Sequence, residues 1–107
     1  MKYLLAGALA LLASAAAAKD QYISAGAGQM GLAIGTGTKL AVPQGTICAY
    51  ITVEGSSVRR TSDGNQPSTT IGTLLPAGAQ WTDCGPLWVY QFTAVSGSPT
   101  LDVEYFK

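Results

Sequence analysis

The segment ICAYITVEG, residues 47–55, decides the fold class of this chain. Apolar side chains alternate with the others along it, so that one face carries Ile47, Ala49, Ile51 and Val53 and the other carries Cys48, Tyr50 and Thr52. Successive side chains of a β-strand point to opposite faces, and the alternation therefore predicts a strand with one face turned to a core. Glu54 and Gly55 end the pattern.

Further short segments of this kind lie on both sides and are separated by turns. The expected strands cover residues 38–42, 58–60, 71–75, 79–82, 87–95 and 101–105. Their spacing predicts an all-β fold, a small β-sandwich over residues 38–107. The pattern apolar-Pro-x-Gly occurs twice, at 42–45 and 75–78. Two similar halves would suit a jelly-roll-like pairing, although similar turn chemistry alone would also produce the repeat.

The composition argues against several classes of function. The 107 residues include six Lys+Arg and six Asp+Glu, and only 11% are charged, which is less than half of the roughly 25% usual in soluble domains. No basic cluster exceeds Arg59-Arg60, so nucleic acid is not an expected partner. A chain with zero net charge and few charges has weak colloidal repulsion, which favours association with copies of itself or with a larger assembly.

The sequence contains no histidine, which removes the usual general base and the commonest metal ligand. No Ser-His-Asp or Cys-His site can be built, although paired carboxylates can act without His. The acidic residues are dispersed and form no Asp-x-Asp calcium pattern. We therefore expect a protein that is not an enzyme and has no catalytic residues, metal or cofactor.

Residues 1–18 differ in kind from the rest. Lys2 precedes an apolar run, and small residues at 14–18 precede the charged pair Lys19-Asp20, which is the layout of a cleaved signal peptide. A second interpretation is an uncleaved hydrophobic helix that serves as an assembly arm, because apolar residues recur at three-to-four spacing. These candidate assembly contacts are Leu5, Leu9 and Leu12. At about 18 residues the run is short for a stable membrane span.

Residues 19–37 are predicted to connect this segment to the β-domain. The stretch SAGAGQMGLAIGTG at 24–37 is rich in glycine and carries no charge, as flexible or extended connectors do. Its Gly-x-Gly pieces lack the strand-loop-helix context of a dinucleotide site.

Three sets of residues are candidate sites. Cys48 and Cys84 would form a disulfide in an exported protein, closing a loop of about 36 residues and contributing roughly 3–4 kcal/mol; in bacterial cytoplasm they would be free thiols. Three aromatic residues occupy alternate positions of the expected strand 87–95. This spacing predicts a stripe that belongs to the core or contacts another subunit, or, together with Trp81, a face that binds sugars. These are Trp88, Tyr90 and Phe92.

The third set is a charged one on and beside the expected strand 58–60. Arg59, Arg60 and Asp63 would form either an exposed charged patch for a partner or a solvated strand edge with a local ion pair.

The ordered motifs from Leu40 to Phe106 resemble a type of small tailed-bacteriophage virion protein. The matching segments are 40–45, 49–55, 58–60, 63–68 with the pattern Asp-Gly-x-x-Pro-Ser, 72–78, and 101–106. The resemblance covers about two thirds of the chain. It implies a non-enzymatic virion protein, used in capsid decoration, a head fibre or the tail, whose partners are copies of itself and other virion proteins.

The N-terminus departs from that pattern, because phage virions assemble in the cytoplasm and would not need a leader. The alternative is a secreted or periplasmic bacterial β-sandwich that binds a partner after its signal peptide is cleaved. The position in a virion, the stoichiometry and any cell-surface ligand do not follow from the sequence.

Overall fold

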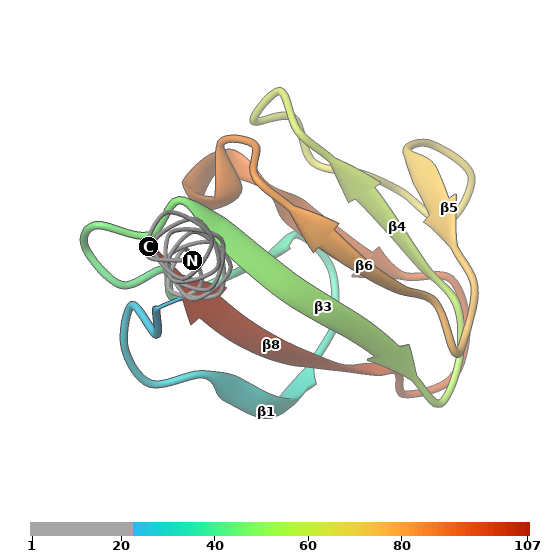
Figure 1. Ribbon diagram of the computed structural model, residues 1–107. Coiled ribbons are helices and arrows are strands. Elements are labelled where there is room, and N and C mark those ends of the chain that lie inside the picture. Colours follow the sequence, from blue (N-terminus) through green and yellow to red (C-terminus); the bar gives the residue numbers. More distant parts are fainter. Residues whose placement is uncertain (1–22) are drawn as a thin grey trace, which may run out of the picture.

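Two four-stranded antiparallel sheets, sheet A and sheet B, make up the computed structural model, which describes residues 23–107. Figure 1 shows sheet A toward the viewer, with β4 and β5 of sheet B behind its β6 side. Sheet A has the order β1 (Gln29–Ala33), β8 (Thr100–Phe106), β3 (Cys48–Glu54) and β6 (Gln80–Asp83). Sheet B has the order β2 (Thr38–Lys39), β7 (Gln91–Ala94), β4 (Val58–Thr61) and β5 (Thr73–Leu75).

The prediction of an all-β, β-sandwich-like fold is confirmed for the described residues. The hydrophobic helix predicted over residues 1–18, with Leu5, Leu9 and Leu12, lies outside them.

The strands pair in a nested order. β1 pairs with β8 and β3 with β6 in sheet A, while β2 pairs with β7 and β4 with β5 in sheet B. The chain therefore alternates between the sheets at most connections, and its first and last strands lie side by side. The ladders between β3 and β8 and between β4 and β7 complete each sheet.

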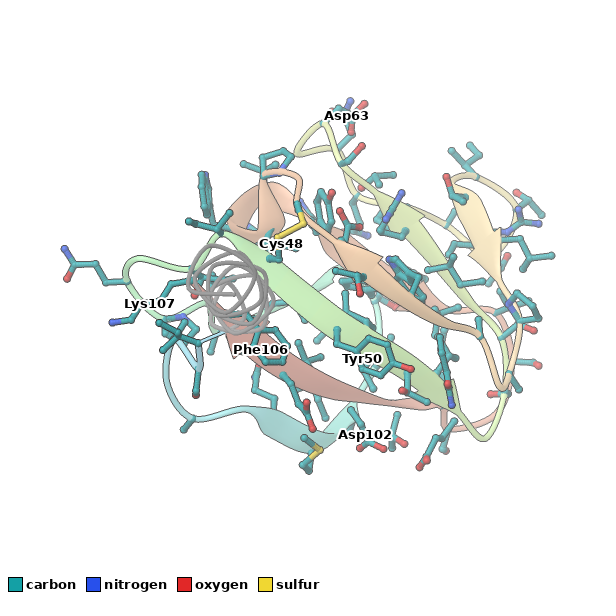
Figure 2. The ribbon with its side chains drawn as sticks, viewed as in Figure 1. Cys48, Tyr50, Asp63, Asp102, Phe106 and Lys107 are labelled. Atoms are coloured by element: carbon teal, nitrogen blue, oxygen red, sulfur yellow. A yellow bond between two sulfur atoms is a disulfide. The ribbon has the colours of Figure 1, made fainter. Side chains whose placement is uncertain are left out.

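β3 forms the centre of sheet A, as its alternation predicts. The side chains of Ala49, Ile51 and Val53 are fully buried, and the core continues through both sheets. Val58 of β4, Phe92 of β7 and the inward residues of β8 meet them from both sides. The inward residues of β8 are Leu101, Val103 and Tyr105. The opposite face of sheet A is polar and solvated, and Figure 2 shows Tyr50 and Asp102 on it.

The repeated apolar-Pro-x-Gly pattern forms the same turn twice. The carbonyl of Pro43 accepts a hydrogen bond from Thr46 N, and that of Pro76 accepts one from Ala79 N. The third residue of each turn is a glycine with positive φ, +86° at Gly45 and +87° at position 78, which is the type II geometry. The first turn lies between β2 and β3 and the second between β5 and β6, so each carries the chain from sheet B to sheet A.

The Gly-rich segment differs from its predicted role as a connector, because residues 29–33 form β1 and Ile34 is buried in the core. Its glycines serve the strand instead. A Cβ at Gly28 would lie 2.5 Å from the carbonyl oxygen of Val103, and Gly31, with φ +67°, sits within a register irregularity of β1. Close approach and a bulge explain this glycine content better than flexibility.

The expected strand over residues 87–95 also differs. Residues Leu87–Val89 form a short 3-10 helix, η1, and β7 begins only at Gln91. Pro86 precedes η1, and its missing N–H removes one donor that a strand would need there. Because η1 breaks the alternation, the three aromatic residues of this stretch do not share one face.

Candidate functional site

A polar cluster centred on Asp83 joins the two sheets. Asp83 ends β6 in sheet A, and Arg60 lies on β4 in sheet B. Oδ2 of Asp83 accepts hydrogen bonds from Nη1 of Arg60 at 2.6 Å and from Nε1 of Trp81 at 3.2 Å. The two charged side chains are 19% and 13% exposed, so solvent screens this ion pair less than a surface pair.

The second oxygen of Asp83 anchors the residues on its C-terminal side. Oδ1 accepts a hydrogen bond from the Tyr90 hydroxyl at 2.7 Å and one from Gly85 N at 3.1 Å. Burial opposes ionisation of Asp83, but these hydrogen bonds, that of Trp81 and the charge of Arg60 outweigh it and hold its pKa below the ordinary value. Asp83 is therefore ionised at neutral pH, and both of its carboxylate oxygens accept hydrogen bonds.

This cluster has no direct signal in the sequence, since Asp83 is one of several dispersed acids. Trp81 and Asp83 of β6 are paired with Ile51 and Ala49 of β3, so their side chains lie on the same, inward face of sheet A. An acid at an inward position of a strand requires a partner, and that requirement is the indirect signal.

Arg60 has no free charge to offer a ligand. Its guanidinium carbon lies 4.8 Å from the centre of the Tyr90 ring, in a cation–π contact, and Asp83 neutralises it. Its buried Nε has no hydrogen-bond partner within residues 23–107.

The predicted charged patch of Arg59, Arg60 and Asp63 does not form as a unit. The Arg59 guanidinium donates to the carbonyls of Thr69 and Gly72. Asp63 accepts hydrogen bonds from the backbone and side chain of Asn65, which lower its pKa. The local, solvated ion pair expected at this edge is replaced by a mostly buried one, between Arg60 and Asp83 on the other sheet.

The loop at residues 62–72 is pinned onto sheet B, which accounts for the motif Asp-Gly-x-x-Pro-Ser. Pro67 is fully buried, and its carbonyl accepts a hydrogen bond from the Thr93 hydroxyl of β7. Ser68 Oγ accepts hydrogen bonds from the backbone of Thr70 and Ile71, which closes the loop. Pro67 and Ser68 of the motif therefore hold this loop on the sheet.

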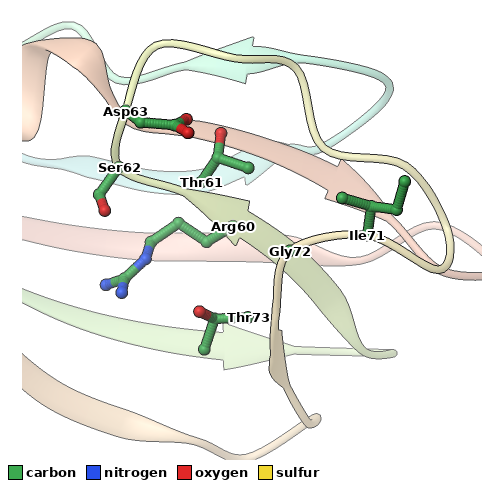
Figure 3. Close-up of a pocket in the computed structure, with 7 residues that line it drawn as sticks. All are labelled: Arg60, Thr61, Ser62, Asp63, Ile71, Gly72 and Thr73. Atoms are coloured by element: carbon green, nitrogen blue, oxygen red, sulfur yellow. The ribbon is translucent and has the colours of Figure 1, made fainter.

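A shallow hollow of about 360 Å³ lies between this loop and β5 (Figure 3). Hydroxyls and a carboxylate face it beside an exposed isoleucine, while Arg60 is already paired. Such a lining suits neutral polar groups better than anions. The residues that line it are Arg60, Thr61, Ser62, Asp63, Ile71, Gly72 and Thr73.

Cys48 and Cys84 are bonded to each other in the structure, with an S–S distance of 2.08 Å. Cys48 begins β3 and Cys84 comes directly after β6. Since Ala49 is paired with Asp83, the antiparallel register brings these two cysteines directly opposite each other. The disulfide links β3 and β6 covalently, one position beyond the last residue pair of their ladder.

The aromatic residues predicted as one assembly stripe have separate roles. Phe92 is fully buried and Tyr90 is 4% exposed, so both belong to the core and neither can be an assembly contact. Trp88 is 61% exposed on η1 and remains available to a partner.

Two further exposed isoleucines lie at the sandwich end that carries the disulfide. Ile47 N donates to the Phe106 carbonyl, and Lys107 N donates to the Ile23 carbonyl. Ile47 and Ile23 are 62% and 55% exposed. We call Ile23, Ile47 and Trp88 the apolar end residues; Ile23 and Ile47 lie beside the C-terminal end of β8, and Trp88 lies on η1, four residues after Cys84 of the disulfide.

Metal-binding and membrane-spanning features are both absent from the described part of the chain. Residues 23–107 contain no group of three or more His, Cys, Asp or Glu placed to hold a metal ion. In the same residues no helix has the length and apolarity needed to cross a membrane.

Comparisons of the sequence with protein-family models and with curated proteins, and of the structure with solved structures, found no match.

Proposed function

We propose that this chain is a non-enzymatic β-sandwich module that is exported from the cytoplasm, oxidised, and docked onto another protein through its apolar end residues. The Cys48–Cys84 disulfide carries the proposal. Disulfides persist in secreted and periplasmic proteins and are rare in reducing cytoplasm, so a directly opposed cysteine pair fits the export interpretation of the N-terminus.

The start of the domain is compatible with cleavage after Ala18. Ser24 already bridges to Phe106, and Ala25 N donates to the Tyr105 carbonyl. Both pairings lie C-terminal to that cleavage point, so the cleaved chain would keep the residues that form them.

The docking part of the proposal rests on exposed apolar side chains. Trp88 is held between buried Leu87 and Tyr90, so it is presented on a fixed turn rather than on a loose loop. Large aromatic residues at rigid positions are favoured as anchors of protein interfaces. The scarcity of charge in the chain favours association of this kind.

A second candidate is the virion structural protein that the sequence resembles, used in capsid decoration, a head fibre or the tail. The nested pairing favours it, because an eight-stranded ribbon paired 1·8, 2·7, 3·6 and 4·5 has the connectivity of a jelly roll. That architecture occurs in viral capsid and lectin domains, and it supports this candidate by fold analogy alone.

Intact mass of the protein recovered from a bacterial host separates the two candidates. Export predicts a periplasmic or secreted chain that lacks residues 1–18 and is two hydrogen atoms lighter than its reduced form. A control variant, Leu9→Arg, interrupts the apolar run and should leave a full-length, reduced protein in the cytoplasm. Recovery of the native chain at full length, with free thiols and in a large particle, would overturn export and support the virion protein.

A further inference from the structure

Residues 84–90, the 84–90 segment, connect β6 to β7 and cover one end of the sandwich. Leu87 of this segment is fully buried and Trp88 is exposed. The backbone N–H groups of Leu87, Val89 and Tyr90 donate to carbonyls of Gly85, Pro86 and Leu87, all within the segment. The internal bonds shape the turn, and they do not attach it to either sheet.

The covalent attachment of the segment is at its first residue, and its hydrogen bonds to Asp83 come from both of its ends. Cys84 is bonded to Cys48 of β3, and Asp83 next to it accepts hydrogen bonds from Gly85 N and the Tyr90 hydroxyl. Asp83 itself is held by Arg60 across the sandwich. The disulfide thus fixes the first residue of the segment to β3, while Asp83 holds Gly85 and Tyr90 noncovalently.

The pairing of the two sheets depends on the disulfide much less than the position of the 84–90 segment does. β3 and β8 are paired over seven residue positions, Cys48 to Glu54, and their inward side chains are fully buried. The disulfide lies at the end of the β3–β6 ladder, beyond its last paired position. A covalent bond at a ladder end constrains the adjoining connection more than the strands themselves, whose pairing and buried side chains already hold them.

We propose that the Cys48–Cys84 disulfide is a redox-dependent tether of the 84–90 segment: oxidation holds this segment and Trp88 on the sandwich, and reduction releases them while both sheets stay folded. Cys84 is exposed, so a reductant can reach the bond. A dithiol supplies two electrons and two protons, which convert the disulfide into two thiols, and the dithiol leaves as a cyclic disulfide. The inference rests on the proposed function in that Trp88 is taken as the docking residue.

Hydrogen–deuterium exchange of the purified protein tests the tether. We expect excess dithiothreitol to accelerate exchange in peptides covering residues 84–90 at least tenfold more than in β8, where exchange reports global unfolding. The double variant Cys48→Ser with Cys84→Ser should exchange at the rate of the reduced protein, and dithiothreitol should not change that rate. Tyr90→Phe, which removes the hydroxyl bond to Asp83 and keeps the disulfide, should accelerate the segment less than threefold.

Three outcomes would overturn the tether. Exchange of the segment that does not change on reduction shows that the disulfide is dispensable, and equal acceleration in β8 shows that it supports the whole sandwich. Acceleration by Tyr90→Phe as large as that of reduction shows that the Asp83 contact holds the segment. Each of these results stands whether or not the chain is exported, because the disulfide can be formed and reduced in the purified protein.

Discussion

The Arg60 guanidinium on β4 and the Asp83 carboxylate on β6 form an ion pair that crosses from one sheet to the other, with 2.6 Å between Nη1 and Oδ2. A pair of this kind repays its desolvation only when further hydrogen bonds satisfy the carboxylate, and Trp81, Gly85 and Tyr90 supply them. Polar contacts therefore join the two sheets where β4 and β6 meet, whereas apolar contacts join them in the interior.

Replacement of Asp83 by Asn should lower the free energy of unfolding by about 2 kcal/mol, because the Arg60 charge then lies partly buried without a counterion. Urea unfolding monitored by tryptophan fluorescence measures the loss. Asp63→Asn is the matched control, since Asp63 lies in an exposed loop and its carboxylate accepts hydrogen bonds from Asn65, two residues away. Equal midpoints for the two variants would show that the cluster contributes nothing to stability.

Acid should weaken the fold through the same carboxylate. Because the pKa of Asp83 is lowered in the folded state, the unfolded chain binds a proton first as the pH falls, and the folded state loses this stabilisation. The contribution is present above the ordinary Asp value of about 4 and disappears as the pH falls through the folded pKa. Urea midpoints measured from pH 7 to pH 2 should fall less steeply for Asp83→Asn than for the native protein.

Alkali should act through two buried phenols. Burial, and then the hydrogen bond to Asp83 and its charge, raise the pKa of Tyr90 to about 12; burial raises that of Tyr105 to about 12. The stabilisation is complete below the ordinary value near 10 and is lost as the pH rises through 12. In a spectrophotometric titration these two tyrosines should ionise well above pH 10, and Tyr90→Phe should remove one of these late steps. Ionisation of every tyrosine in a single step near pH 10 would contradict this.

The central strand and the repeated turns could be read from the sequence because each is specified locally. Alternation at 47–53 determines which side chains of β3 enter the core, and a Pro-x-Gly pattern determines a turn within four residues. β1 could not be recognised in this way, since Gly28 beside it is required by the close approach of Val103, far along the chain, and Gly31 by a positive φ. Composition alone made that segment resemble a connector.

The Asp83 cluster was beyond local prediction for the same reason. Its members come from β4, β6 and the 84–90 segment, and only the pairing of the sheets brings them together. The cysteines differ in one respect: the sequence left a disulfide and free thiols open, but with two cysteines only one disulfide pairing was possible.

Alanine at Gly45 or at position 78 should lower the free energy of unfolding by about 1–2 kcal/mol each, because a Cβ is strained at positive φ even where open space surrounds it. Gly35→Ala is the control: its φ is not in the strained range and a Cβ there meets only the Thr38 hydroxyl, at 4.0 Å. Thermal unfolding should show two similar losses and no loss for the control. A harmless substitution at one turn only would show that the two turns are not equivalent in solution.

Trp88 and Phe92 should respond oppositely to truncation, although the sequence places them on one alternating stripe. Phe92→Ala empties a fully buried site and should lower the free energy of unfolding by about 3–5 kcal/mol. Trp88→Ala removes a side chain that is 61% exposed, so stability should change by less than about 0.5 kcal/mol while association with the partner weakens. Urea unfolding measures the first effect, and retention of the protein in its native assembly during size-exclusion chromatography measures the second. Leu74→Ala, which truncates another exposed apolar residue, on sheet B, is the control for nonspecific loss of hydrophobic surface. If Leu74→Ala weakened the assembly as much as Trp88→Ala, the apolar end would have no special role in docking.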